Sequence, residues 1–325
     1  MLNAHNVLQR AAQTKFGTAV VKTTAKLQGV SSFSLTPDLQ TRALDQLRGS
    51  LAPTYQTALD HYMSNATFEV SDETFEDINY WLDSLFTAAT PAGTGPYTRA
   101  YTAPLTSEAA PTFMTLQWGQ TSGVYQMQDA SVTTLTLSGS NNSGVQVGGS
   151  LIGGKVVVGA LEALPDRTGL TRMTGCMGAL AIDTWAGTMG NTAVATSAFS
   201  WELTINANRQ YRSYLGSCEP AAWNDQKWNG QLKLSLELNT STDDYLTAML
   251  AATNTILERQ IEISYTNGTD DLLEVQFAGH TMSAPQLFQD RNGVLSYDLV
   301  FDGVYNSTFG NWLKINTTSG INTLA

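Results

Sequence analysis

The residue types that most often carry out catalysis or bind metals are few in this chain and lie far apart. The three histidines are His5, His61 and His280, and none has a second ligand at the spacing of a metal site. A histidine needs a convergent partner to act as a general base or as a ligand. His61 falls in an alternating stretch over residues 58–68, and we place His280 on a strand surface too. We therefore predict no catalytic residues, no bound metal, no cofactor and no enzymatic activity.

Two acidic pairs suggest cation binding as an alternative. The pair Asp243-Asp244 is better explained as the first turn of a helix, where carboxylates complement the helix dipole. The pair Asp270-Asp271 follows Asn267-Gly268, which is typical of a hairpin turn. Calcium loops need more carboxylates at alternate positions than either pair supplies. Calcium binding is therefore the weaker interpretation of both pairs.

The seven tryptophans offer a second kind of site, a platform of aromatic rings. Trp81 falls in a predicted helix and Trp201 in a predicted strand, so core packing explains both. Trp223 and Trp228 flank a polar loop and are the pair that we expect to be exposed. Buried aromatic side chains anchor protein contacts, so a role in an interface outweighs carbohydrate binding for this pair.

The two cysteines, Cys176 and Cys218, both lie in the second half of the chain. Two cysteines do not make a disulfide framework. We expect two buried free thiols, in keeping with a reducing compartment. A disulfide between them remains the alternative.

Strand patterns dominate the elements that must position these residues. Residues 131–137, 199–205 and 231–238 alternate between apolar and polar side chains, as half-buried antiparallel strands do. Residues 138–144 and 289–293 are polar and contain Gly or Asn, which is typical of hairpin turns. The chain is therefore predicted to be mainly β.

One helix is predicted in each half, directly after an alternating strand. In the first, Ser71 or Asp72 is the expected N-cap, and acidic residues follow in the first turn. The apolar stripe of this helix comprises Phe75, Ile78, Leu82, Leu85 and Phe86. In the second, residues 240–242 supply the cap. Its apolar stripe comprises Tyr245, Leu246, Met249 and Leu250.

The order of these elements repeats, and short motifs repeat with it. Gly49, Ser50 and Pro53 recur as Gly216, Ser217 and Pro220 at an offset of 167 (216 − 49). Residues 66–70 face 234–238 at an offset of 168 (234 − 66). Residues 142–145 face 291–294 at an offset of 149 (291 − 142). Matches in one order indicate a duplicated domain.

The duplication predicts two domains, residues 1–169 and 170–325. The fall in offset predicts an insertion of 19 residues (168 − 149) in the first domain. We place it between residues 87 and 118, where prolines and glycines accumulate, and expect it to form a surface loop.

Composition excludes several classes of protein. A chain of 325 residues with 42% hydrophobic and 14% charged residues is folded and long enough for two domains. The 17 Lys and Arg residues are scattered and the net charge is −11, which disfavours gripping nucleic acid. The sequence shows no secretory signal and no apolar stretch that could span a bilayer. We expect a soluble protein made in a cytoplasm.

Taken in order, these motifs resemble the tail-tube protein (major tail protein) of long-tailed bacteriophages. The resemblance rests on residues 17–20, with a similar stretch at 187–188, on the loop motif at 47–53, and on the hairpins at 142–144 and 291–293. The motifs are short, but their order and repetition cover nearly the whole chain. The resemblance implies two tandem tail-tube-type β-sandwich or barrel domains, each with one flanking α-helix.

The resemblance also implies a function. In that family six domains form a ring, the rings stack around a tape-measure protein, and the tube later conducts DNA. With two domains in each chain, three chains would make one pseudo-hexameric ring. The implied partners are further copies of the chain, the tape-measure protein, the tail terminator and baseplate or tip proteins. Double-stranded DNA would pass through the lumen without specific binding, and the implied location is the virion tail, assembled in the host cytoplasm.

Two polar loops, residues 37–55 and 206–224, resemble the long loop by which tube rings touch their neighbours. The residues expected in such inter-ring or inter-subunit contacts are Arg48, Gly49, Pro53, Gly216, Pro220, Trp223 and Trp228. An acidic protein would suit a lumen that repels phosphate.

Other classes of protein stay open at this point. A two-domain β-sandwich adhesin or carbohydrate-binding protein would use exposed tryptophans. A hydrolase on a β scaffold would need catalytic groups that converge from distant parts of the sequence. Within the structural class, a secretion-system tube or another virion protein is a further alternative.

Overall fold

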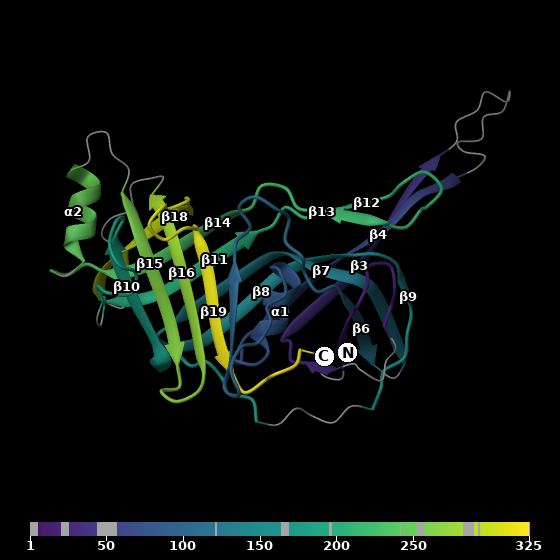
Figure 1. Ribbon diagram of the computed structural model, residues 1–325, viewed down its shortest axis with the longest axis horizontal. Coiled ribbons are helices and arrows are strands. Elements are labelled where there is room, and N and C mark those ends of the chain that lie inside the picture. Colours follow the sequence, from purple (N-terminus) through teal and green to yellow (C-terminus); the bar gives the residue numbers. More distant parts are fainter. Residues whose placement is uncertain are drawn as a thin grey trace.

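The computed structural model describes residues 6–20, 26–43, 57–120, 122–163, 169–194, 197–240, 242–251, 257–281, 289–291 and 293–324. Antiparallel strands dominate these residues, as predicted, and they form an open sheet rather than a closed barrel (Figure 1). The elements of the first half are β1 (Val7–Ala12), β2 (Lys26–Gln28), β3 (Ser32–Ala43), β4 (Thr57–Val70), α1 (Ile78–Leu85), β5 (Tyr97–Thr102), β6 (Met114–Gln120), β7 (Gly123–Ser140), β8 (Ser143–Gly153) and β9 (Val156–Val158).

The second half follows with a similar series. Its elements are the short 3-10 helix η3 (Gly175–Met177), β10 (Gly178–Thr184), β11 (Ala198–Asn206), β12 (Gln210–Arg212), β13 (Ala222–Asn224), β14 (Asn229–Glu237), α2 (Asp243–Ala251), β15 (Glu258–Thr266), β16 (Leu272–Thr281), β17 (Gln289–Arg291), β18 (Val294–Gly303) and β19 (Leu313–Ser319). Strands β12 and β13 pair only with each other among the described residues.

One layer of the sheet crosses both halves. Its strands pair in the order β3, β4, β8, β7, β11, β14, β18 and β17. The central pairing, β7 with β11, joins the halves through seven matched residues from Ser200 opposite Ser140 to Asn206 opposite Thr134. The halves therefore share a backbone ladder and not only side-chain contacts.

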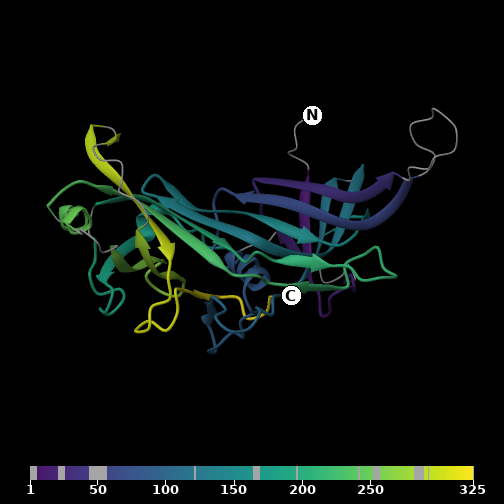
Figure 2. The ribbon, with the colours of Figure 1, turned by 90° about the horizontal axis from the view of Figure 1, so that it is seen from above.

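A second layer packs behind the first in each half (Figure 2). In the first half β2, β1, β6, β7 and β9 pair in that order. In the second half the order is β10, β15, β16, β19 and β5. Strand β7 belongs to both layers because it bends near Asp129, whose φ of 53° is left-handed.

Alternation along the strands explains which side chains form the core. In β14, Leu232, Leu234 and Leu236 are buried, and in β7, Leu135 and Leu137 are. The expected strands at 131–137, 199–205 and 231–238 lie within or along β7, β11 and β14. The expected turn at 138–144 is shorter, because β7 runs to Ser140 and β8 begins at Ser143, and the expected turn at 289–293 begins with the strand β17. These strand predictions are confirmed.

The two helices differ in the burial of the side chains that the structure describes. All eight residues of α1 are buried, and Trp81 stacks on Phe68 with ring centroids 3.8 Å apart. This helix begins at Ile78, so the expected caps Ser71 and Asp72 lie too early; Thr74 Oγ1 instead accepts a hydrogen bond from the Asp77 N–H at 3.1 Å. Helix α2 carries exposed Asp243 and Asp244 in its first turn, as expected.

The stretch 87–118 is not the surface loop that we expected. It contains β5 and the beginning of β6, and β5 pairs with β19 of the second half. Tyr101 in β5 is buried and donates a hydrogen bond to Asp83 of α1 at 3.0 Å. The loop prediction failed because strand pairing between the halves supplies partners that the local sequence does not reveal.

The cysteines also differ from the expectation. Cys176 and Cys218 are both free and both exposed, so the prediction of buried thiols is wrong. Cys176 lies in η3, and Cys218 lies in the connection between β12 and β13. Among the described residues, no helix is long and apolar enough to cross a membrane.

Candidate functional site

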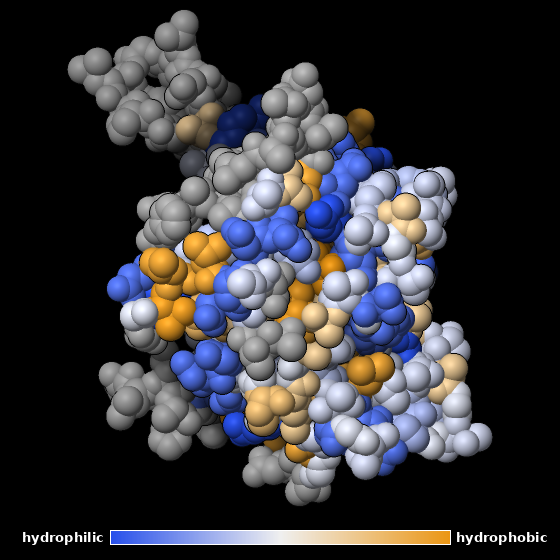
Figure 3. Space-filling model, turned by 90° about the vertical axis from the view of Figure 1, so that its left-hand side faces the viewer, coloured by the Kyte–Doolittle hydropathy of each residue, from blue (hydrophilic) through white to orange (hydrophobic). Residues whose placement is uncertain are grey.

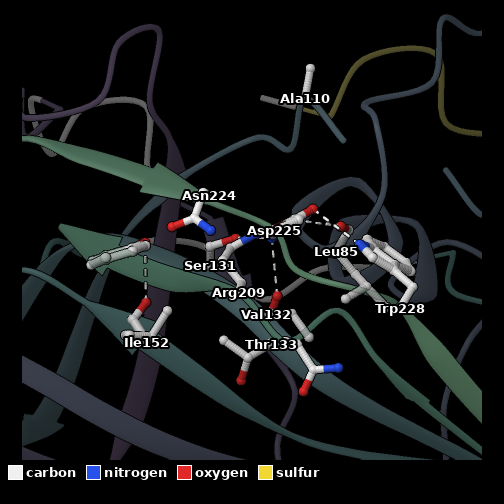
Figure 4. A network of polar contacts seen from close by, with 12 residues as sticks. Leu85, Ala110, Ser131, Val132, Thr133, Ile152, Arg209, Asn224, Asp225 and Trp228 are labelled. Atoms are coloured by element: carbon white, nitrogen blue, oxygen red, sulfur yellow. Dashed lines mark hydrogen bonds and ion pairs between the residues drawn. The ribbon is translucent and has the colours of Figure 1, made fainter. Parts of the chain in front are cut away.

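The strongest polar cluster in the described part of the chain lies where the two halves meet. It is centred on Arg209, which follows β11 and precedes β12 (Figure 4). Arg209 Nε donates to Asp225 Oδ1 at 2.7 Å and Nη2 donates to Asp225 Oδ2 at 3.0 Å. The two side chains are 0% and 2% exposed. This is a bidentate pair in the geometry that favours arginine.

The same guanidinium also bonds to the first half. Nη1 donates to the Ser84 carbonyl at 3.0 Å, to Ser131 Oγ at 2.5 Å and to the Val132 carbonyl at 3.1 Å. Nη2 donates to the Leu85 carbonyl at 2.9 Å. Ser84 and Leu85 end α1, so a cation lies at the negative end of the helix dipole and satisfies carbonyls without helical partners. Arg209 therefore binds the second half to the first.

Aromatic rings surround this ion pair. Trp228 Nε1 donates to Asp225 Oδ2 at 3.2 Å, and the Trp228 ring lies 5.3 Å from the ring of Phe86. Trp228 is buried, so the expectation of an exposed Trp223–Trp228 pair is wrong for Trp228. Trp223 is partly buried in β13 and lies 5.6 Å from the ring of Phe113. This pair is therefore not an open aromatic platform for a sugar.

Tyr211 makes a second attachment. Its hydroxyl donates to the Asp129 carbonyl and lies 3.3 Å from the Ile152 carbonyl. Burial raises the pKa of Tyr211 well above its ordinary value, more than the nearby Arg209 lowers it, so the phenol stays a donor. Burial also raises the pKa of the Asp129 carboxyl, which accepts the Gly17 N–H at 2.7 Å. We call residues 207–228, with β12 and β13, the docked hairpin.

The tip of the docked hairpin holds the repeated loop motif. Gly216 has a φ of 92° and open space around it, so glycine serves the turn there, and Pro220 is buried. The Cys218 carbonyl accepts the Tyr62 N–H at 2.8 Å, and Glu219 pairs with Lys155 at 3.1 Å. These contacts place the hairpin against β4, as Figure 1 shows. Tyr214 and Leu215 remain exposed.

The corresponding loop of the first half begins with a projecting two-stranded segment (Figures 1 and 2). We call residues 38–43 of β3 and 57–63 of β4 the arm. Leu39 and Leu59 are exposed on it, and Arg42 pairs with Asp60 at 3.6 Å. The expected contact residues Arg48, Gly49 and Pro53 lie outside the described residues.

The remaining chemistry-bearing residues take structural places. His61 lies in β4 and His280 in β16, apart from each other, while His5 lies outside the described residues. Asn267 Oδ1 accepts the N–H groups of both Asp270 and Asp271 at 3.0 Å, so this acidic pair belongs to a turn. The described residues contain no group of three or more His, Cys, Asp or Glu that could hold a metal.

The residues that carry the site were not the ones singled out from the sequence. Trp228, Trp223 and Pro220 belong to the docked hairpin, but Arg209, Tyr211 and Asp225 make its polar attachments. One signal was present: Arg209 and Arg42 stand at an offset of 167 (209 − 42), the same as the loop glycines. An arginine thus recurs next to the recurring loop, and each of the two arginines pairs with an aspartate.

The site holds the two halves of the chain together through an ion pair and hydrogen bonds. The model of the phage tail tube protein family matches residues 4–303, nearly the whole chain, and the protein therefore belongs to that family. It is a structural protein of the bacteriophage virion, located in the tail tube, where self-association and contact with other tail components are implied. Among curated proteins, none matches this chain.

Proposed function

We propose that three copies of this chain form one ring of a phage tail tube, each copy contributing two tube-type domains, residues 1–169 and 170–325. The observation that carries the proposal is the β7–β11 ladder, which already joins two such units edge to edge within one chain. A ring of six units needs that junction six times, three within chains and three between them. Stacked rings would then make the conduit for DNA ejection.

The order of strand pairing supports the two-unit interpretation. In the first half β3 pairs with β4, β4 with β8, and β8 with β7. In the second half β11 pairs with β14, β14 with β18, and β18 with β17. The helix follows β4 in one series and β14 in the other. Two copies of one unit give this correspondence.

The free edges identify the proposed junction between chains. By the correspondence, β3 matches β11, and β7 matches residues 272–289 at an offset of 149 (272 − 123), a range that begins with β16 and ends at the first residue of β17. In the described residues β3 pairs only with β4 and β17 pairs only with β18. Exposed strand edges invite pairing with another chain. We therefore assign the junction to β17 of one copy and β3 of the next, which makes a heterologous contact that closes.

The outward face of the continuous layer suits a lumen. Across the junction of the halves it presents Thr136, Ser138, Glu202 and Thr204, which alternate with buried leucines and aliphatic residues. A polar face with net acidity of the whole chain, −11, would let DNA pass without adhesion. The tape-measure protein would occupy that lumen before ejection, and terminator and baseplate or tip proteins would close the ends. Assembly in the host cytoplasm fits the exposed free thiols.

Electron microscopy of the purified full-length chain tests the proposal. We expect rings with three-fold symmetry and a central hole, and tubes at higher protein concentration. Light scattering across a range of salt and protein concentration measures the same association in solution. Stable monomers under every condition would overturn the proposal, and so would rings whose symmetry is not three-fold.

A further inference from the structure

The arm and the docked hairpin each carry an Arg–Asp ion pair, in opposite surroundings. Arg42 and Arg209 stand at the repeat offset, and each pairs with an aspartate of the returning segment, Asp60 in β4 and Asp225 directly after β13. The side chains of Arg209 and Asp225 are 0% and 2% exposed, whereas those of Arg42 and Asp60 are 65% and 47% exposed. The hairpin of the second half is buried against the first half of its own chain. Among the described residues, the arm contacts the rest of its own chain at its base, where Tyr62 donates to the Cys218 and Val156 carbonyls, but its ion pair stays exposed.

The surface that would receive the arm can be found by the same correspondence. Arg209 binds Ser131 Oγ and the Val132 carbonyl of β7, and at the offset of 149 these positions are His280 and Thr281 of β16 (280 − 131). Arg209 also binds the end of α1, whose counterpart is the end of α2. By this correspondence, the receiving surface lies on β16 at His280 and Thr281.

The charge of that surface favours an arginine. His280 stands directly opposite Glu258 of β15 on one side and opposite Asp302 of β18 on the other. Residues directly opposite each other in an antiparallel pair share a face of the sheet. Glu258 is exposed and Asp302 is half-buried, so two carboxylates border the position that corresponds to Ser131. A complementary pair of charges fixes the register of an interface.

We infer that the arm of one copy lies across the second half of a neighbouring copy, with Arg42 over His280 and flanked by Glu258 and Asp302, as the docked hairpin lies across the first half. Leu39 and Leu59, exposed at 52% and 46%, become buried in this contact. The contact rests on the proposed function, because it adds a side-chain attachment to the β17–β3 junction. A single chain cannot make it: the arm and β18 lie at opposite ends of the molecule in Figure 1.

The receiving end of the molecule is visible in Figure 3. That face mixes hydrophilic and hydrophobic groups and is not one apolar patch. Such a surface suits a partner with both a cation and apolar side chains, which the arm presents. A second copy of this chain is therefore the occupant that the described residues favour.

Cross-linking tests the contact. In a Cys176→Ser, Cys218→Ser background, we combine Arg42→Cys with Asp302→Cys and treat assembled particles with a short bis-maleimide. We expect dimers and trimers that are linked between copies. The matched control pairs Asp302→Cys with Arg172→Cys, because Arg172 is 69% exposed and pairs with Asp72 at 3.4 Å outside the arm. The control is expected to give no link.

Charge reversal supplies the second measurement. Arg42→Glu is expected to raise the protein concentration needed for assembly about tenfold, because it places a third acid at the site. Adding Asp302→Arg is expected to restore assembly, whereas Arg172→Glu leaves it unchanged. Assembly of the parent chain without the 42–302 link, or without rescue by the double reversal, overturns this contact and leaves the proposed function intact. A parent chain that never assembles overturns both.

Discussion

The docked hairpin and the arm are corresponding loops with different fates in one molecule. The hairpin anchors itself through Arg209, Tyr211 and Trp228 to the first half. The arm projects, and its ion pair faces solvent. The difference shows that corresponding segments of the two halves take different places, one docked on the other half and one with an exposed ion pair. Substitutions of matched residues in the two segments test whether burial accounts for the difference.

Removal of the aspartate from each ion pair is expected to give the largest contrast. Asp225→Ala strands the Arg209 cation in a buried site and should lower the free energy of unfolding by about 3–5 kcal/mol. Asp60→Ala removes an exposed partner, and about 0–1 kcal/mol is expected. Denaturant unfolding of the unassembled chain measures both values. Equal losses for the two variants would mean that burial does not distinguish the loops.

The two helices offer a second pair of positions, one buried in α1 and one exposed in α2. Leu82 lies in α1 with 0% exposure, and Leu82→Ala should cost about 2–5 kcal/mol through lost contacts and a residual cavity. Thr247 is exposed in α2, and Thr247→Ala should change stability by no more than about 0.5 kcal/mol. Thermal unfolding followed by circular dichroism gives both effects. A large loss from Thr247→Ala would show that α2 is packed as α1 is.

Sequence patterns predicted the strands well because alternation is a local property. The alternation of leucine with polar residues in β14 and β7 predicts which face of each strand is buried. The helical spacing of apolar residues predicted α1 but not that all eight of its residues are buried. Glu73 and Glu76 look like solvent-facing acids at the start of a helix, yet both are buried. Glu76 accepts the Thr171 N–H at 3.0 Å, a contact with the connection between the halves that no local pattern contains.

The candidate site was predictable only in part, because its contacts join residues that lie far apart in the sequence. The repeated Gly-Ser-Pro motif pointed to both loops, and the structure makes one of them the docked hairpin. Trp228 was expected to be exposed because its own neighbours in sequence are polar. Its cover comes from Phe86, at the end of α1 in the other half. Arg209 likewise has acceptors that only the β7–β11 junction brings near.

A tyrosine in each of the two segments is expected to give a smaller difference in stability. Tyr211→Phe removes the hydroxyl that bonds the Asp129 carbonyl, and a loss of about 0.5–1.5 kcal/mol is expected. Tyr62 of the arm donates to the Val156 carbonyl at 2.9 Å from a half-buried position. Water can replace its hydroxyl, so Tyr62→Phe should cost less than Tyr211→Phe. Chemical denaturation ranks the two variants, and the reverse order would contradict the assigned burial.

The smallest expected contrast is in the response to pH of two aspartates, one in each half. Burial raises the pKa of Asp83 above its ordinary value of 3.8, although the Ala89 N–H and the Tyr101 hydroxyl oppose the shift. Burial would also raise the pKa of Asp298, but hydrogen bonds from Ser235 and Lys233 and the charges of Lys233 and Arg291 lower it below 3.8.

These directions have opposite consequences for stability. The contribution of Asp83 is complete below its ordinary pKa and is lost as the pH rises through its higher folded-state pKa. The contribution of Asp298 is present above its ordinary pKa and is lost as the pH falls through its lower folded-state pKa. Asp83→Asn keeps an oxygen for both donors and removes the charge. The effect of Asp83→Asn on the free energy of unfolding should therefore be more favourable at about pH 7 than at about pH 3. Asp298→Asn should instead destabilise the chain more at about pH 7 than at about pH 3. Unfolding of each variant and the parent at both pH values measures the difference, and shifts of the same sign in the two variants would show that one of these environments has been wrongly assigned.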